Sequence, residues 1–197
     1  MSGVPCATLR PADRAARVSL VTELRNVPPA PVVDQLLAAN ARYADTFAAR
    51  AAGADISSPR PTRHTAVVCC MDARIDLFPL LGLRLGESHI IRNAGGIATD
   101  DVLRSLALSQ RKLGTTEVMI VHHTDCGLHG LDEEELLADI EAEVGQRPPF
   151  GFGAFVDLDA SVRESVSRVR AAPFVPHRDH VRGFVVDVST GRLREIV

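Results

Sequence analysis

The sequence predicts an α/β fold in which a mostly parallel central sheet is flanked by helices. Short apolar runs rich in β-branched residues alternate with longer segments of helical periodicity, and such runs are typical of strands buried on both faces. The 197 residues, 46% of them apolar and 24% charged, suffice for one globular domain with a sizeable core. Alternating strands and helices favour right-handed crossovers, which place a ligand crevice at the carboxyl ends of the strands.

The N-terminal region is predicted to have two parts. Residues 1–31 contain closely spaced prolines and no clean hydrophobic period, so we expect a loosely attached arm. Residues 32–52 carry apolar side chains at helical spacing, which predicts an amphipathic helix that packs on a neighbour. The Ser- and Pro-containing segment 53–63 is predicted to be an exposed connection, and residues 32–197 are expected to form a single catalytic domain.

The remaining elements follow from the change of pattern after this connection. Four apolar runs predict parallel strands at residues 65–70, 88–93, 117–123 and 181–188. Helices are predicted at residues 76–83, 99–113, 131–144 and 159–171. Thr99 and Gly114 supply the cap residues of the second of these helices.

Composition excludes several classes of function. The net charge of −3, with no basic stripe, argues against binding to nucleic acid. The chain contains no apolar run of the roughly 18 residues that a membrane span needs, and its first thirty residues lack an apolar signal region. We therefore expect a cytoplasmic protein without a membrane partner. Two of the four cysteines, Cys69 and Cys70, are adjacent, which favours metal or thiol chemistry over a disulfide framework.

Metal-ligand residue types stand at the ends of two predicted strands. Cys70 ends the first strand, while His123 ends the third and is followed by Cys126 in the next loop. Because the carboxyl ends of parallel strands meet at one edge, we expect these side chains to converge. Two thiolates and one imidazole suit zinc, and three protein ligands leave a fourth position open, as in catalytic zinc sites.

Asp72 and Arg74 follow Cys70 at the spacing that puts alternate residues of an extended chain on one side. Zinc bound by two thiolates and a neutral histidine is formally neutral, so lowering the pKa of its bound water to about 7 requires help. We expect Asp72 to orient a zinc-bound hydroxide and Arg74 to hold this carboxylate bidentately. A purely structural ion pair is the alternative for the two residues.

The motifs Cys-Met-Asp-Ala-Arg at 70–74 and His-x-x-Cys-Gly at 123–127 resemble those of the β-class carbonic anhydrases. The resemblance also covers residues 86–96 and the helix at 99–113. It implies a zinc enzyme that interconverts carbon dioxide with bicarbonate and a proton. It further implies zinc on Cys70, His123 and Cys126, an Asp72–Arg74 dyad, and a homodimer or homotetramer whose N-terminal helix embraces its partner.

Some positions depart from the family pattern. His89 stands where many members carry a phenylalanine that lines the substrate pocket, so it could relay protons or simply form the wall. Gly127, beside Cys126, is assigned to the same pocket. Pro61 replaces a glutamine that contacts substrate in plant-type members. The absence of Trp and the presence of only Tyr43 argue against control by a non-catalytic bicarbonate site.

Other interpretations remain open. The same nucleophile could attack carbon disulfide or carbonyl sulfide. Alternatively, Asp72 could close the metal shell as a fourth ligand in a non-enzymatic module, with Cys69 as a redox sensor. Cys69 is more simply a buried core residue, His122 a core or interface histidine, and His129 a solvated loop histidine.

Overall fold

The computed structural model describes residues 31–54 and 56–197, so the arm predicted at 1–31 lies almost entirely outside the described residues. The chain divides into two units between Ala52 and Gly53. The first contains α2 (Pro31–Arg50), whose side chains from Val32 to Arg50 are exposed. The second contains the sheet and the remaining helices.

The sheet confirms the predicted fold class. Its strands lie in the order β2-β1-β3-β4-β5. Their bounds are β1 (Thr65–Cys70), β2 (Ser88–Asn93), β3 (Glu117–His123), β4 (Val181–Val186) and β5 (Leu193–Glu195). The first four are parallel, whereas β5 pairs with β4 in the antiparallel sense and was not predicted. β4 ends two residues earlier than expected, because the chain turns at 187–191 to return as β5.

The helices lie close to their predicted positions. They are α3 (Leu77–Leu81), α4 (Asp100–Leu113), α5 (Glu133–Val144) and α6 (Leu158–Arg170), with a short 3-10 turn, η1 (Ala94–Gly96), before α4. α5 begins two residues later than predicted because Asp132 is its N-cap and accepts a hydrogen bond from the Glu135 N–H. Within the part of the chain that is described, no helix has the length and apolar character to cross a membrane.

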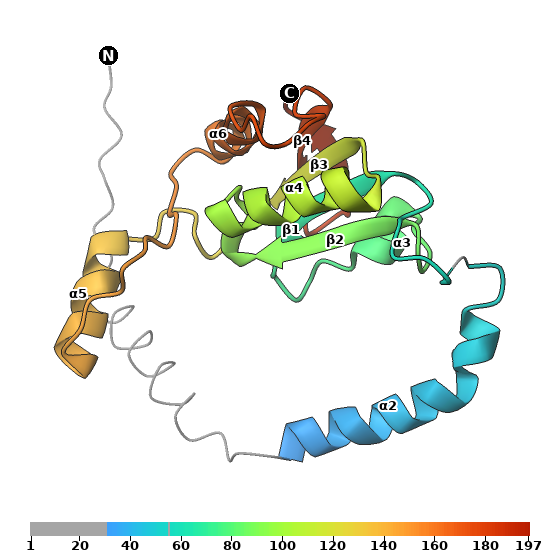
Figure 1. The fold of residues 1–197 in the computed structure, drawn as a ribbon. Helices are drawn as coiled ribbons and strands as arrows, with labels where there is room; N and C mark the ends of the chain where they lie inside the picture. The colour runs from blue at the N-terminus through green and yellow to red at the C-terminus, as the bar shows by residue number, and fades with distance from the viewer. Residues whose placement is uncertain (1–30, 55) are drawn as a thin grey trace. The chain divides into compact units, whose positions relative to one another are not determined.

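Apolar side chains cover both faces of the sheet. The strands are apolar along their length instead of alternating between apolar and polar residues, so both faces must be buried. On one face, α4 packs along β1 and β2 while α6 packs along β3 and β4 (Figure 1). On the other face, α3 and the loops that follow β1 and β3 cover Val67, Cys69 and Val121. Among the strand residues that are described, the buried histidines His122 and His123 lie where β3 ends.

The carboxyl ends of β1, β2 and β3 meet at one edge of the sheet. Cys70 is paired with Asn93 of β2, and Cys69 is paired with Val121 of β3. The next residues along β3 include His123, so the two predicted ligand-bearing strands end side by side. This edge is the expected position of a ligand site in a parallel sheet.

Gly96 of η1 packs against this edge of the sheet. Its φ is +68°, and a Cβ at this position would lie 2.7 Å from the Cys70 nitrogen and 2.9 Å from the Cys69 carbonyl carbon. Both of these atoms are backbone atoms of β1 and cannot move away as a side chain could. Only glycine allows η1 to lie directly on the end of the strand that carries Cys70.

We predict that Gly96→Ala lowers the free energy of unfolding by about 2–5 kcal/mol, the sum of left-handed strain and overpacking. Gly82→Ala is the matched control, since Gly82 has a φ of +62° but nothing within 4 Å of a Cβ. It should lose only about 1–2 kcal/mol. Denaturant unfolding measures both values, and equal losses would show that close packing against β1 is unimportant.

Candidate metal centre

Cys70, His123 and Cys126 converge at the carboxyl edge of the sheet. One ligand atom from each residue lies within 4.8 Å of the others, and all three side chains are buried. Cys70 and His123 come from the ends of neighbouring strands, and Cys126 comes from the loop after β3. The structure thus brings together the three residues that were singled out as metal ligands.

The hydrogen bonding of His123 fits a metal ligand. Its Nδ1 lies 2.9 Å from the backbone carbonyl oxygen of Thr124, so this nitrogen carries the proton and donates. Its Nε2 is buried and has no hydrogen-bond partner among the described residues. A buried acceptor nitrogen without a partner is costly unless a cation binds it, and a backbone carbonyl on the other nitrogen is the usual support for a ligating histidine.

The adjacent cysteines differ in their acidity. Burial opposes ionisation of the Cys70 thiol, but the His123 imidazole and the backbone N–H groups of Asp72 and Gly95 outweigh it and lower the pKa of Cys70 to about 7. Burial raises the pKa of Cys69 to about 11. Because the thiolate is the form that binds metal, only Cys70 of this pair has the character of a ligand near neutral pH.

Cys126 differs from Cys70. Burial raises the pKa of Cys126, and the proximity of Cys70 adds to this effect because two neighbouring thiolates repel each other. A divalent cation between the two sulfur atoms would reverse this repulsion. Two sulfurs and one nitrogen at this separation are a donor set that zinc prefers, so the residues fit the ion that the sequence predicts.

Asp72 and Arg74 lie beside the three donors. Arg74 donates from Nε to Asp72 Oδ1 (3.0 Å) and from Nη2 to Asp72 Oδ2 (2.8 Å), and its backbone N–H also donates to Oδ1. These hydrogen bonds hold the pKa of Asp72 well below its usual range. Asp72 Oδ2 is also 3.9 Å from His123 Nε2. An ionised carboxylate therefore borders the candidate metal position while it is bound to Arg74.

Two further residues support this region and were not identified from the sequence. Arg92 of β2 donates to the carbonyl oxygens of Cys70 (2.9 Å) and Asp72 (2.6 Å), which fixes the backbone between them. Asp125 accepts a hydrogen bond from Arg74 (2.6 Å) in the loop that carries Cys126. A signal was present for Asp125, since a short polar residue between two candidate ligands is a common turn residue.

The remaining histidines and Gly127 do not join the donor set. His89 lies near the amino end of β2, where its Nδ1 contacts Ser109 Oγ (2.7 Å) and its Nε2 contacts the Pro59 carbonyl (3.0 Å). Gly127 follows Cys126 with open space at its Cα.

His122 is fully buried near Phe155, and burial lowers the pKa of His122 to about 4. His129 stacks on the same Phe155 ring.

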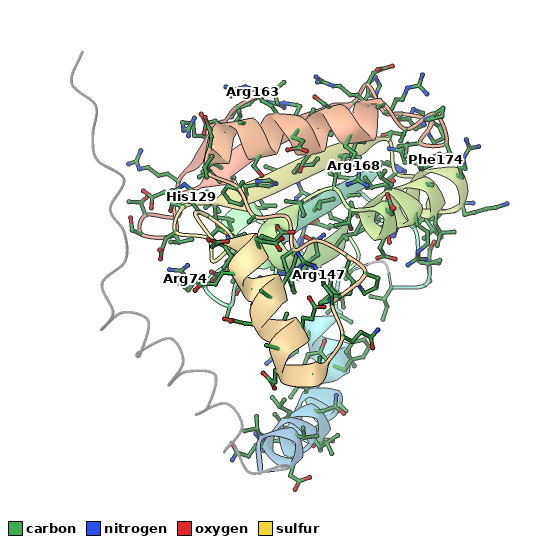
Figure 2. The ribbon with its side chains drawn as sticks, turned by 90° about the vertical axis from the view of Figure 1, so that its left-hand side faces the viewer. Arg74, His129, Arg147, Arg163, Arg168 and Phe174 are labelled. Atoms are coloured by element: carbon green, nitrogen blue, oxygen red, sulfur yellow. The ribbon has the colours of Figure 1, made fainter. Side chains whose placement is uncertain are left out.

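Figure 2 shows Arg74 and His129 near the same end of the sheet, where the loops after β1 and β3 lie. Arg74 is partly exposed, with 46% of its side chain accessible. The three donor residues are buried. The site is therefore layered, with metal-binding groups inside and a charged pair at the opening.

Comparisons with known proteins give a consistent result. A family model described as "Carbonic anhydrase" matches residues 65–143. Beta-carbonic anhydrase 1 of Mycobacterium tuberculosis is 44% identical over 84% of this chain and 98% of its own length. A carbon disulfide hydrolase of Acidithiobacillus thiooxidans is 32% identical over 67% of this chain and 76% of its own length. The crystal structure of a Streptococcus mutans carbonic anhydrase matches with a TM-score of 0.77 and 36% identity, covering 86% of this chain and all of that one.

We predict that Cys70→Ala abolishes stable zinc binding, because two donors cannot hold the ion as three do. Cys69→Ala is the matched control, since it removes the neighbouring buried thiol from outside the donor set. The metal content of each purified variant, measured by mass spectrometry after brief dialysis against a chelator, should be near zero for the first variant and near one ion per chain for the second. Equal zinc retention by the two variants would remove Cys70 from the ligand set.

Proposed function

Because the chain belongs to the β-carbonic anhydrase family, we propose that it catalyses the zinc-dependent reversible hydration of carbon dioxide to bicarbonate and a proton. The observation that carries this proposal is the convergence of Cys70, His123 and Cys126 next to an ionised Asp72. Three protein donors leave room for one more ligand, which is the arrangement of a catalytic zinc site.

The proposed division of labour follows from the contacts. When bound there, zinc would supply Lewis acidity to a coordinated water, and Asp72 would supply the further help that this formally neutral centre needs to lower the pKa of that water. Asp72 accepts a hydrogen bond from the attacking oxygen and so directs a lone pair of that oxygen toward carbon dioxide. Arg74 keeps Asp72 ionised and fixes the direction of its carboxylate through two parallel hydrogen bonds.

A second substrate class is supported by one observation. The carbon disulfide hydrolase from Acidithiobacillus thiooxidans is 32% identical to this chain. Carbon disulfide is linear like carbon dioxide, so the same nucleophile can attack its carbon. Carbon dioxide stays the proposed substrate because the 44% identical relative, which this chain covers over 98% of its length, is a carbonic anhydrase.

We further propose a cytoplasmic homodimer or homotetramer in which α2 packs on a partner subunit. Several large apolar side chains of α2 are exposed within the described chain; they are Val32, Val33, Leu36, Leu37, Tyr43 and Phe47. Exposed apolar groups gathered on one helix are typical of an interface. A reducing compartment would also keep the ligand thiols available to the metal.

We predict that the zinc-loaded protein hydrates carbon dioxide and that Asp72→Asn lowers kcat roughly 10- to 100-fold while zinc is retained. The amide keeps the size of the side chain but loses the charge that Arg74 binds. Stopped-flow mixing with a pH indicator measures the rate, and metal analysis of the same sample checks the zinc content. Glu195→Gln, which breaks an ion pair with Arg182 elsewhere on the surface, should have no effect.

The same preparation distinguishes the two substrate classes. If the zinc-loaded wild-type protein releases sulfide from carbon disulfide and does not hydrate carbon dioxide, the carbonic anhydrase assignment is wrong and the hydrolase assignment replaces it. If neither reaction is observed, the zinc site is not catalytic for linear heterocumulenes.

We predict that Leu36→Glu converts the proposed oligomer to a smaller species, because burying a leucine side chain contributes about 1.5–3 kcal/mol that a carboxylate cannot supply. Gln35→Glu is the control, since it adds the same charge to the neighbouring exposed position of α2. Light scattering after gel filtration gives the mass of each species. A wild-type mass equal to one chain would contradict the proposed assembly, and unchanged mass in Leu36→Glu would move the interface away from α2.

A further inference from the structure

Arg74 is shared by two carboxylates. One side of its guanidinium binds both Asp72 oxygens, as described above, while Nη1 donates to Asp125 Oδ2 (2.6 Å) and Nη2 donates to the Asp125 carbonyl oxygen (2.9 Å). Each guanidinium nitrogen of Arg74 therefore has an acceptor. Since Asp72 and Arg74 follow β1 and Asp125 follows β3, Arg74 links the two loops that carry the metal donors.

The backbone aims Asp125 at Arg74. Asp125 has a φ of +56°, and His64 is the only other residue besides glycine with a positive φ in the described chain. Aspartate and asparagine tolerate this left-handed conformation better than most residues. Its neighbour Thr124 is anchored to β4, because its N–H donates to the Val186 carbonyl and its Oγ1 accepts from the Val188 N–H. The direction of Asp125 is thus set by the framework.

This placement has a consequence for Asp72. The Asp72 Oδ2 atom is 3.9 Å from His123 Nε2, so a small rotation would bring the carboxylate onto a metal held by the three donors. The Arg74 backbone N–H holds Oδ1 in any case, but the two side-chain hydrogen bonds oppose that rotation only while the Arg74 guanidinium stays in place. The contacts with Asp125 hold the guanidinium along its Nη1–Nη2 edge, which adjoins the Nε–Nη2 edge that binds Asp72.

We propose that Asp125 is a positioning residue, which holds Arg74 where it binds Asp72 and thereby keeps the Asp72 carboxylate off the open coordination position of the metal. The role deepens the function proposed above and rests on it. The size of the effect is limited, because the Asp125 side chain is 79% exposed and exposed ion pairs are weak. The carbonyl contact to Arg74 also survives any change of side chain.

The test is a double-mutant cycle read by two measurements. Asp125→Asn keeps the side-chain shape and tolerates the left-handed backbone, whereas Asp125→Gly removes the side chain and also tolerates that backbone. Each is made alone and combined with Asp72→Asn. The measurements are kcat for carbon dioxide hydration and the affinity of azide for the cobalt(II)-substituted protein, followed by visible absorption. Azide competes for the coordination position that Asp72 would take.

We expect Asp125→Asn to lower kcat and azide affinity by roughly two- to fivefold, and Asp125→Gly to lower them at least as much. Zinc content should not change. In the Asp72→Asn background both substitutions at 125 should have no effect on azide affinity, because the group through which they act is gone. Glu195→Gln, which breaks a comparable exposed arginine pair at 2.6 Å, should change neither measurement.

Three results would overturn the proposal: no change in azide affinity, an equal change in both backgrounds, or parallel loss of zinc, which would mean that Asp125 supports the ligand loop itself. Failure of the proposed function gives a different result. If wild-type protein does not hydrate carbon dioxide but azide affinity still depends on Asp125 only when Asp72 is present, the positioning role stands and the enzymatic assignment falls.

Discussion

The parallel register between β1 and β3 is the constraint on which the donor set depends. Because Cys69 is paired with Val121, the two strands end together, and Cys70 and His123 leave the sheet as neighbours. A slip of one residue would turn every side chain of one strand to the opposite face and bury the wrong residues on both. The apolar core on the two faces opposes such a slip. Hydrophobic packing therefore fixes the relative position of Cys70 and His123, although most of the residues that pack lie outside the donor set.

The sequence pattern predicted the strands that are buried in this core, and it missed the short strand at the edge of the sheet. β1, β2 and β3 were predicted with their observed bounds, because short apolar runs of that length are typical of buried strands. β5 was missed, since Leu193–Glu195 is short, carries Arg194 and Glu195, and becomes a strand only through pairing with β4. Its signal is a tertiary contact, which no local pattern contains.

The same distinction applies to the site. The predicted ligands converge because Cys and His are chemically specific and strand ends fix their positions. Arg92 and Asp125 were not predicted, because the first acts across the sheet on a neighbouring strand and the second depends on a positive φ. His89 was placed in the substrate pocket by resemblance alone. Within one chain both of its ring nitrogens have partners near the amino end of β2, and its proposed pocket role stays a prediction.

The buried metal donors are held firmly, whereas the charged residues at the opening of the site are held by weaker contacts. The donors are buried, and strand register holds two of them, Cys70 and His123. The Asp72–Arg74–Asp125 group lies at the opening, where side-chain exposure rises from 18% for Asp72 to 79% for Asp125 and each ion pair is correspondingly weak. A fully buried pair would hold Asp72 in one arrangement at a large desolvation cost. The weak contacts from Asp125 to Arg74 and from Arg74 to Asp72 favour the position of Asp72 next to Arg74. If these contacts weaken, Asp72 can move while the buried metal donors keep their positions.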